Sequence, residues 1–181
     1  DPYERLYIQW SLSKFFPAKT MGSHVTNWNK NTSVKFRTDV CSSCKLGFDI
    51  DLKSLSEDDY KFVQQAVKNY NSMKPVILEG DQYRLVSPYE GSHCAVNYVS
   101  KDKQRAVLFA YDLHPRYKEP QMNVKLQGLN PTKLYTVKET NLMPGKTSEL
   151  ECDGKQYSGD YLMKVGLSVF SAQDGTSHVL T

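Results

Sequence analysis

Two aspartates, Asp49 and Asp51, are the first pair of groups in the sequence that could do chemistry together. They stand in "LGFDIDL", where apolar and polar residues alternate as in a strand with one buried face. In such a strand both carboxylates share a face, with backbone positions ~6.5–7 Å apart. That spacing suits a glycosidase acid/base pair or a hard-cation site. An alternating strand also places polar residues on its wetter face, and we favour this structural interpretation.

A histidine and a tryptophan form a second candidate. His24 lies in "MGSHVT", which has the pattern of a short strand, and Trp28 follows it. An aromatic ring at a strand end could stack on the apolar face of a sugar, which makes both residues candidates for substrate binding. A lone histidine beside a tryptophan is more commonly packed in a core, and we favour that interpretation.

The four cysteines include a "CSSC" pair, Cys41 and Cys44, while Cys94 and Cys152 stand alone. A structural zinc site needs a second close pair or histidines, and only His93 lies beside Cys94. A thioredoxin-like motif should lie in a βαβ unit, and no such pattern is apparent around Cys41. We therefore predict small, semi-buried thiols with no metal, no cofactor and no lasting disulfide.

Other signals exclude several function classes. His93, His114 and His178 have no acidic or serine partner close in sequence, and the motifs of serine hydrolases, phosphate-binding loops and zinc peptidases are absent. The net charge of +3 is small and the basic residues are scattered, which argues against nucleic-acid binding. No stretch reaches the ~18 apolar residues of a membrane span, and no secretory signal is visible. We expect a soluble protein and leave its compartment, cytoplasmic or periplasmic, open.

The elements that must position these residues begin with a helix. Asp1 can cap it, Pro2 suits its first turn, and Glu4 completes a capping box. The helix should run until Pro17 breaks it. Its apolar residues fall on more than one side, which predicts neighbours on several sides and a piece of a longer protein.

The next segments alternate between strand and helix. "MGSHVT" predicts a strand, the polar stretch Asn27–Thr38 a loop, and "KLGFDIDLK" a second strand. Ser56 and Asp59 form another capping box that starts a helix ending at Pro75. Such alternation is typical of an α/β layer or barrel, but two strands and two helices cannot close a barrel.

After Pro75 the helical period disappears. Turn-rich links separate eight apolar runs: "VIL", "YRLVS", "CAVNYV", "RAVLFAYDL", "MNVKLQGL", "LYTVKE", "YLMKVGLSVF" and "HVLT". This spacing is typical of an antiparallel β-sandwich. We predict an α+β chain in two parts: the edge of a truncated (β/α)₈ barrel at 1–75, and an antiparallel sandwich at 76–181.

Several segments resemble the α-galactosidases of glycoside hydrolase family 36. The most specific is "DPYERLYIQWSLSKFFPAKTMGSHVT". Its matching positions are Asp1, Pro2, Arg5, Leu6, Ile8, Gln9, Ser13, Pro17, Met21, Gly22, Ser23, His24, Val25 and Thr26. "LGFDIDL" is similar to the family's Leu-Gly-Tyr-Glu-Leu-Asp-Leu, with Phe48 and Asp49 as departures. "AVLFAYDL", "LQGLNPTKLY" and "SGDYLMKVGL" resemble its C-terminal domain.

The resemblance implies a position in a larger enzyme. Family members have an N-terminal β-supersandwich, a (β/α)₈ barrel and a C-terminal β domain, and this chain would begin at the sixth barrel helix. They are retaining glycosidases with one aspartate as nucleophile and another as acid/base. The nucleophile would lie much earlier, and the acid/base group about three residues before Asp1. No catalytic residue is then expected within the chain, and Asp1 remains a helix cap that could only be a distant substitute.

The implied partners are α-galactoside oligosaccharides, bound by the whole protein, and the missing N-terminal and barrel parts. Alone, the chain would be inactive. Two alternatives remain open. One is a carbohydrate-binding β module, which would need a flat platform of aromatic side chains such as Tyr83, Tyr89 and Tyr98. The other is a structural domain that covers a barrel or supports a homo-oligomer.

Overall fold

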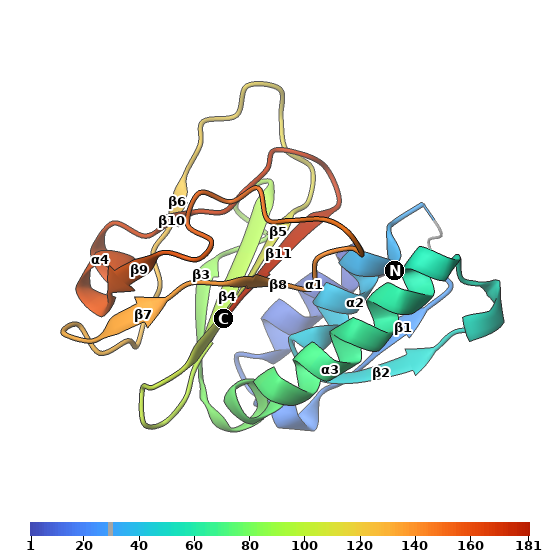
Figure 1. Cartoon of the computed structure of the whole chain (residues 1–181), viewed down its shortest axis with the longest axis horizontal. Coiled ribbons are helices and arrows are strands. Elements are labelled where there is room, and N and C mark those ends of the chain that lie inside the picture. Colours follow the sequence, from blue (N-terminus) through green and yellow to red (C-terminus); the bar gives the residue numbers. More distant parts are fainter. Residues whose placement is uncertain (29–30) are drawn as a thin grey trace.

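The computed structural model describes residues 1–28 and 31–181. The chain forms three layers (Figure 1). Helices α1 to α3 and a two-stranded parallel sheet lie on one side, a five-stranded antiparallel sheet lies in the middle, and short strands with a small helix lie on the other side. The predicted α+β class with antiparallel sheets is confirmed. Among the described residues, no helix combines the length and the apolar character that crossing a membrane requires.

The first helix, α1, spans Pro2–Leu12. Asp1 Oδ1 accepts hydrogen bonds from the backbone N–H groups of Tyr3 at 2.9 Å and Glu4 at 3.3 Å, so the predicted cap is confirmed. The helix ends at Leu12, before the predicted break at Pro17, and turns lead to the short 3₁₀ helix η1 (Ala18–Thr20).

Strands β1 (Gly22–Thr26) and β2 (Lys45–Asp49) pair in parallel across helix α2 (Val34–Ser42). The predicted loop Asn27–Thr38 is therefore wrong from residue 34 onward. Ser33 Oγ accepts from Phe36 N at 3.0 Å and starts the helix. The polar composition concealed this helix because several of its polar side chains are buried rather than solvated. Asn29 and Lys30, within the same predicted loop, lie outside the described residues.

Helix α3 spans Glu57–Glu79 and follows the 3₁₀ helix η2 (Leu52–Ser54). Its predicted start is confirmed, since Ser56 Oγ accepts from Asp59 N at 3.1 Å. Its predicted end is wrong, because the helix continues through Pro75 and includes the run "VIL" that was expected to be a strand. An internal proline costs about 3 kcal/mol, which burial of Val76 and Ile77 offsets. The predicted division at residue 75 thus falls inside a helix.

The central sheet has the strand order β3-β4-β5-β11-β8 and is antiparallel throughout. The strands span Asp81–Val86, His93–Val99, Ala106–Asp112, Thr176–Leu180 and Glu139–Thr140, respectively. Every residue of β4 is buried, because layers cover both faces of the sheet. Alternate residues of β5 serve two different cores: Phe109 packs toward the helices and Leu108 toward the short strands.

The third layer contains two short antiparallel pairs. They are β6 (Asn123–Val124) with β10 (Leu167–Ser168), and β7 (Leu134–Thr136) with β9 (Gln156–Ser158). Helix α4 (Gly159–Lys164) corrects the prediction that all of "YLMKVGLSVF" is a strand. Ser158 Oγ accepts from Tyr161 N at 3.1 Å, a cap that the apolar run concealed.

A buried polar cluster joins α2 to the central sheet. Asp39 is completely buried, and its Oδ2 accepts from Lys35 Nζ at 2.5 Å and Ser177 Oγ at 2.7 Å. Its Oδ1 accepts from Asn141 Nδ2 at 2.7 Å. The cluster satisfies the buried carboxylate with partners from β11 and the segment after β8, so it holds the helical layer in one position on the sheet.

Candidate functional site

The carboxyl ends of β1 and β2 form the first candidate site. Ligands of α/β layers bind where parallel strands end, because the following helices begin there. Thr26 and Asp49 are the last residues of the two strands and lie opposite each other in register. Arg37 of α2 donates to the Thr26 carbonyl at 2.7 Å and fixes this edge.

His24 lies on β1 opposite Gly47, on the face that points away from the helices. A Cβ atom on Gly47 would lie 2.2 Å from His24 Cδ2, so the imidazole occupies the space above this glycine. The flanking Ser23 and Val25 point into the helical layer and are buried. His24 is exposed and Trp28 is 76% exposed, so the expectation that they are packed in a core is wrong for this chain. Both remain candidates for substrate binding.

The two aspartates do not form the predicted pair on one strand face. Strand β2 ends at Asp49, whereas Asp51 caps η2 and accepts from Lys53 N at 3.0 Å. The chain leaves the strand because Asp51 satisfies a free N–H of the next helix. Among the described residues, no three side chains of His, Cys, Asp and Glu are grouped closely enough to hold a metal ion.

The cysteines have a context that the sequence did not reveal. Cys41 lies in α2 and Cys44 just before β2, so the pair does belong to a βαβ unit, contrary to the prediction. All four cysteines are free and buried, rather than semi-buried. Burial raises the pKa of Cys44 and of Cys94 to about 12, which keeps these thiols protonated and unreactive at neutral pH.

Three histidines have acidic partners that are distant in sequence. The Nδ1 atom of His93 lies 2.9 Å from Asp112 Oδ1, and that of His114 lies 3.4 Å from Asp174 Oδ2. The Nδ1 atom of His178 lies 2.6 Å from Glu139 Oε1. Sequence reasoning missed these pairs because strand register and loop packing create them. The first pair follows from the β4–β5 register, in which His93 is opposite Asp112.

The Glu139 carboxylate contacts two side chains, those of His178 and Ser148. Burial by itself would raise the pKa of Glu139, but hydrogen bonds from His178 and from Ser148 outweigh it and lower that pKa. Neither His178 nor Ser148 is placed as in a nucleophilic triad, since both contact the carboxylate rather than each other.

The flat platform that a carbohydrate-binding β module would need from Tyr83, Tyr89 and Tyr98 is not formed. Tyr98 is 1% exposed and its hydroxyl donates to the Ser43 carbonyl at 2.7 Å across the core. The ring of Tyr83 lies over Gly128, whose left-handed backbone and missing side chain make room for it. Of these three tyrosines, Tyr89 alone is well exposed.

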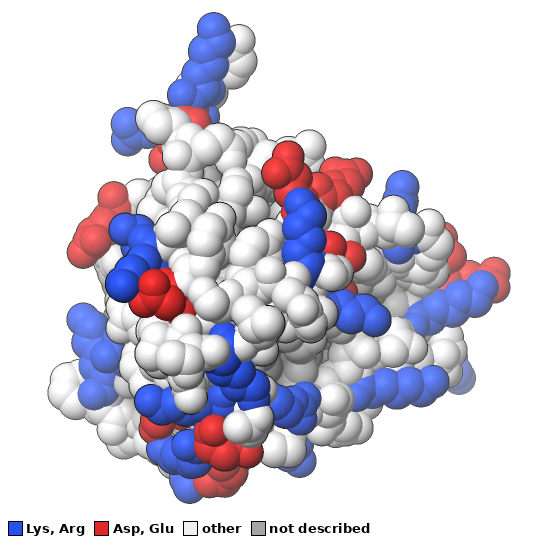
Figure 2. All heavy atoms as spheres, turned by 60° about the vertical axis from the view of Figure 1, so that its left-hand side comes forward, with Lys and Arg blue, Asp and Glu red and all other residues white. Residues whose placement is uncertain are grey.

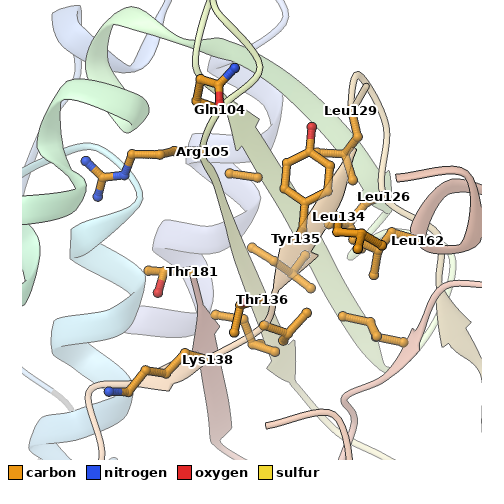
Figure 3. Close-up of a pocket in the computed structure, with 15 residues that line it drawn as sticks. Gln104, Arg105, Leu126, Leu129, Leu134, Tyr135, Thr136, Lys138, Leu162 and Thr181 are labelled. Carbon is orange, nitrogen blue, oxygen red and sulfur yellow. The ribbon is translucent and has the colours of Figure 1, made fainter. Parts of the chain in front are cut away.

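An apolar cavity of about 400 Å³ lies between the central sheet and the third layer (Figure 3). Leu126, Leu129, Leu134 and Leu162 gather around it with Tyr135, while the side chain of Arg105 extends away from it. Arg105 instead donates to the Ser72 carbonyl at 2.9 Å. Such a lining offers contact to an apolar group and few hydrogen bonds to a sugar.

Charge gives no further site on the face shown in Figure 2. Lys and Arg side chains alternate there with Asp and Glu around an uncharged centre. Nothing on that face resembles the basic stripe expected for nucleic-acid binding.

Comparison with known proteins covers nearly the whole chain. A family model described as "Melibiase" matches residues 1–80, and one described as "Glycosyl hydrolase family 36 C-terminal domain" matches residues 93–181. Alpha-galactosidase 1 of Pediococcus pentosaceus is 31% identical over 92% of this chain. Probable alpha-galactosidase G of Aspergillus terreus is 29% identical over 92% of it. The chain spans 22% of the length of each of these relatives.

Solved structures agree with this result. The α-galactosidase AgaB of Geobacillus stearothermophilus superimposes on the entire chain with a TM-score of 0.83 at 27% identity. A variant of AgaA from the same organism, in complex with raffinose, covers 99% of the chain with a TM-score of 0.84 at 26% identity. The chain corresponds to 24% of each structure. This chain therefore belongs to glycoside hydrolase family 36, with residues 93–181 forming the family's C-terminal domain.

Proposed function

We propose that this chain is the C-terminal part of a retaining α-galactosidase that removes terminal α-galactosyl residues from oligosaccharides. The observation that carries the proposal is the match of both family models, which together span residues 1–80 and 93–181. Neighbouring structures contain raffinose and stachyose, which supports oligosaccharides as substrates. No cofactor is required, because two carboxyl groups suffice for retaining hydrolysis.

The proposed fold of the whole protein continues the helical layer into a (β/α)₈ barrel, with residues 1–75 as its last part and α3 running across the boundary into a β-sandwich domain at 76–181. Strands β1 and β2 pair with no other strand among the described residues, which leaves both outer edges open to further parallel strands. Helix α1 and the turn after it expose Ile8, Leu12 and Phe15 at 55%, 41% and 80%. These apolar side chains are suited to contact with a neighbouring barrel helix.

The catalytic nucleophile and acid/base group of the proposed enzyme lie upstream of Asp1. Asp1 itself is engaged in capping α1. His24 and Trp28 are the proposed sugar contacts of this chain. His24 lies on the face of the β1–β2 sheet that points away from the helices, and Trp28 follows the carboxyl end of β1. Retaining hydrolysis needs one carboxylate as the nucleophile and a second carboxyl group as the acid/base. His24 and Trp28 supply neither, so the chain alone is inactive in this proposal.

A structural role for the C-terminal sheet is a second candidate function. The buried Asp39 cluster favours it, because three hydrogen bonds, from Lys35 to the Ser177 carbonyl and from Ser177 and Asn141 to Asp39, hold α2 against β11 and the segment after β8. This role is compatible with the first, since a fixed sheet would support the barrel helices.

The proposed activity is tested by assaying the hydrolysis of an aryl α-galactoside by the whole protein and by the 181-residue chain at equal concentration. The proposal predicts turnover by the whole protein and none by the chain above a heat-denatured control. Turnover by the chain would place a catalytic pair within residues 1–181. An inactive whole protein would contradict the assigned activity.

A further inference from the structure

A second hollow, of about 790 Å³, lies away from the β1–β2 edge, between α1 and two loops of the central sheet. The loops are the turn before β4, which carries Tyr89, and the segment after β5, which carries Tyr117 and Glu119. Its size falls within the ~300–1,000 Å³ of typical ligand pockets. Its lining differs from that of the leucine-rich cavity, because tyrosines and ionisable groups face the same space.

One of the two aromatic rings of this hollow, that of Tyr89, is held in place while remaining open to solvent. Tyr89 is 61% exposed, yet its ring meets Tyr7 edge-on at 5.0 Å and its hydroxyl lies 2.9 Å from Ser11 Oγ. Tyr117 is 91% exposed. A fixed aromatic ring with a free face loses little entropy when an apolar face of a ligand stacks on it.

The polar part is connected to the interior of the sheet. Glu119 Oε1 lies 3.9 Å from Nε2 of the buried His93, whose other ring nitrogen lies 2.9 Å from Asp112. Asp112 is in turn fixed by Ser171, which donates from its backbone N at 2.9 Å and its hydroxyl at 2.8 Å. The His93 ring also stacks on Phe170 at 4.1 Å. The Glu119 carboxylate at the rim of the hollow therefore lies near the buried His93–Asp112 pair, at a distance longer than a hydrogen bond.

The charge state of Glu119 is suited to accepting hydrogen bonds. The Arg116 N–H donates to its Oε2 at 2.9 Å and lowers the pKa of the carboxyl. An ionised carboxylate accepts hydrogen bonds from two hydroxyl groups at once. A pyranose ring presents hydroxyl groups around its edge and apolar C–H groups on a face.

We propose that this hollow binds a pyranose unit of a carbohydrate, with the sugar ring contacting both Tyr89 and Tyr117 and its hydroxyls hydrogen-bonded to Glu119. The site is separate from the candidate residues His24 and Trp28. The choice of an α-galactosyl unit as the ligand rests on the proposed function, whereas the choice of a pyranose rests on the lining of the hollow.

Affinity electrophoresis of the whole protein tests this site, with a galactomannan bearing α-galactosyl side groups cast into a native gel. The variants are Tyr117→Ala and Glu119→Gln, and the matched control is Tyr161→Ala, which removes a tyrosine 41% exposed in α4, outside the hollow. Any contribution from the reaction site is common to all four proteins. We expect retardation about two- to tenfold weaker in the first two variants, the factor that loss of one aromatic or hydrogen-bond contact gives, and unchanged in the control.

Three results would overturn the proposal: an unretarded wild-type protein, equal retardation of Tyr117→Ala, Glu119→Gln and wild type, or an equal loss in the Tyr161→Ala control. Turnover of an aryl α-galactoside by the wild-type preparation reports separately on the proposed function. A retarded but inactive wild-type protein contradicts the proposed function and leaves the hollow standing, whereas an active protein that the polymer does not retard contradicts the hollow alone.

Discussion

The two faces of the central sheet are packed by different means. The face toward α1 to α3 carries large aromatic side chains and the buried Asp39 cluster, with hydrogen-bond partners from distant segments. The face toward the short strands is mostly apolar, with hydrogen bonds between Asn97 and Gln127 and from Ser171 to Asp112, and it leaves an apolar cavity of about 400 Å³. Directional hydrogen bonds fix one relative position, whereas aliphatic contacts tolerate several. The cavity indicates that the third layer packs less closely on the sheet than the helices do.

The Asp39 cluster should show the largest effect. Asp39→Ala leaves the partly buried Lys35 cation without its carboxylate and removes the acceptors of Ser177 and Asn141. Loss of one partner of a buried ion pair costs about 3–5 kcal/mol. Urea unfolding should show that loss, while Asp49→Ala at the exposed end of β2 should stay within about 0.5 kcal/mol of wild type. Equal effects of both variants would mean that the cluster does not hold the layers together.

Two adjacent residues of β11 test the packing of the two faces directly. Val179 is completely buried toward the helices, whereas Leu180 lines the cavity. Val179→Phe should overpack its face and cost about 1–3 kcal/mol, because close-packed interiors accept added volume poorly. Leu180→Phe should cost less than about 1 kcal/mol, since the ring can enter the cavity. If chemical denaturation gave the same loss for both, the two faces would be packed equally well.

The smallest effect concerns pH. The pKa of Glu139 is lowered in the folded chain, so the unfolded chain binds the proton more readily. This contribution to stability is complete above the ordinary glutamate pKa of about 4.3 and is lost as the pH falls through the lower folded value. Thermal unfolding between pH 7 and pH 3 should therefore show a steeper loss in wild type than in Glu139→Gln. Parallel curves would contradict the lowered pKa.

Much of this fold could be predicted from local patterns. The caps at Asp1 and Ser56 and the strand at Gly22–Thr26 depend on neighbouring residues and were identified correctly. Helix α2 was missed because its polar residue Asp39 is satisfied by partners from β11 and the segment after β8, which no local pattern contains. The helix through Pro75 was missed for a similar reason, since tertiary burial outweighs the local cost of proline.

The candidate sites follow the same rule. His24 and Trp28 were found because type and spacing in one short segment sufficed. The hollow that contains Tyr89 and Glu119 was not found from the sequence, because a turn, a loop and a helix create it. The nearby His93–Asp112 pair also joins two different strands. The one signal available in the sequence was the group of charged and aromatic residues between Arg116 and Glu119, directly after an apolar strand pattern.

The most direct test of the central claim is the stereochemistry of hydrolysis by the whole protein. Proton NMR can follow the anomeric signal of the galactose first released from an aryl α-galactoside, before mutarotation mixes the two forms. Two successive displacements at the anomeric carbon, through a covalent intermediate, predict α-galactose as the first product. Initial release of β-galactose would contradict a retaining mechanism, and the absence of any galactose would contradict the assignment of this chain to an active α-galactosidase.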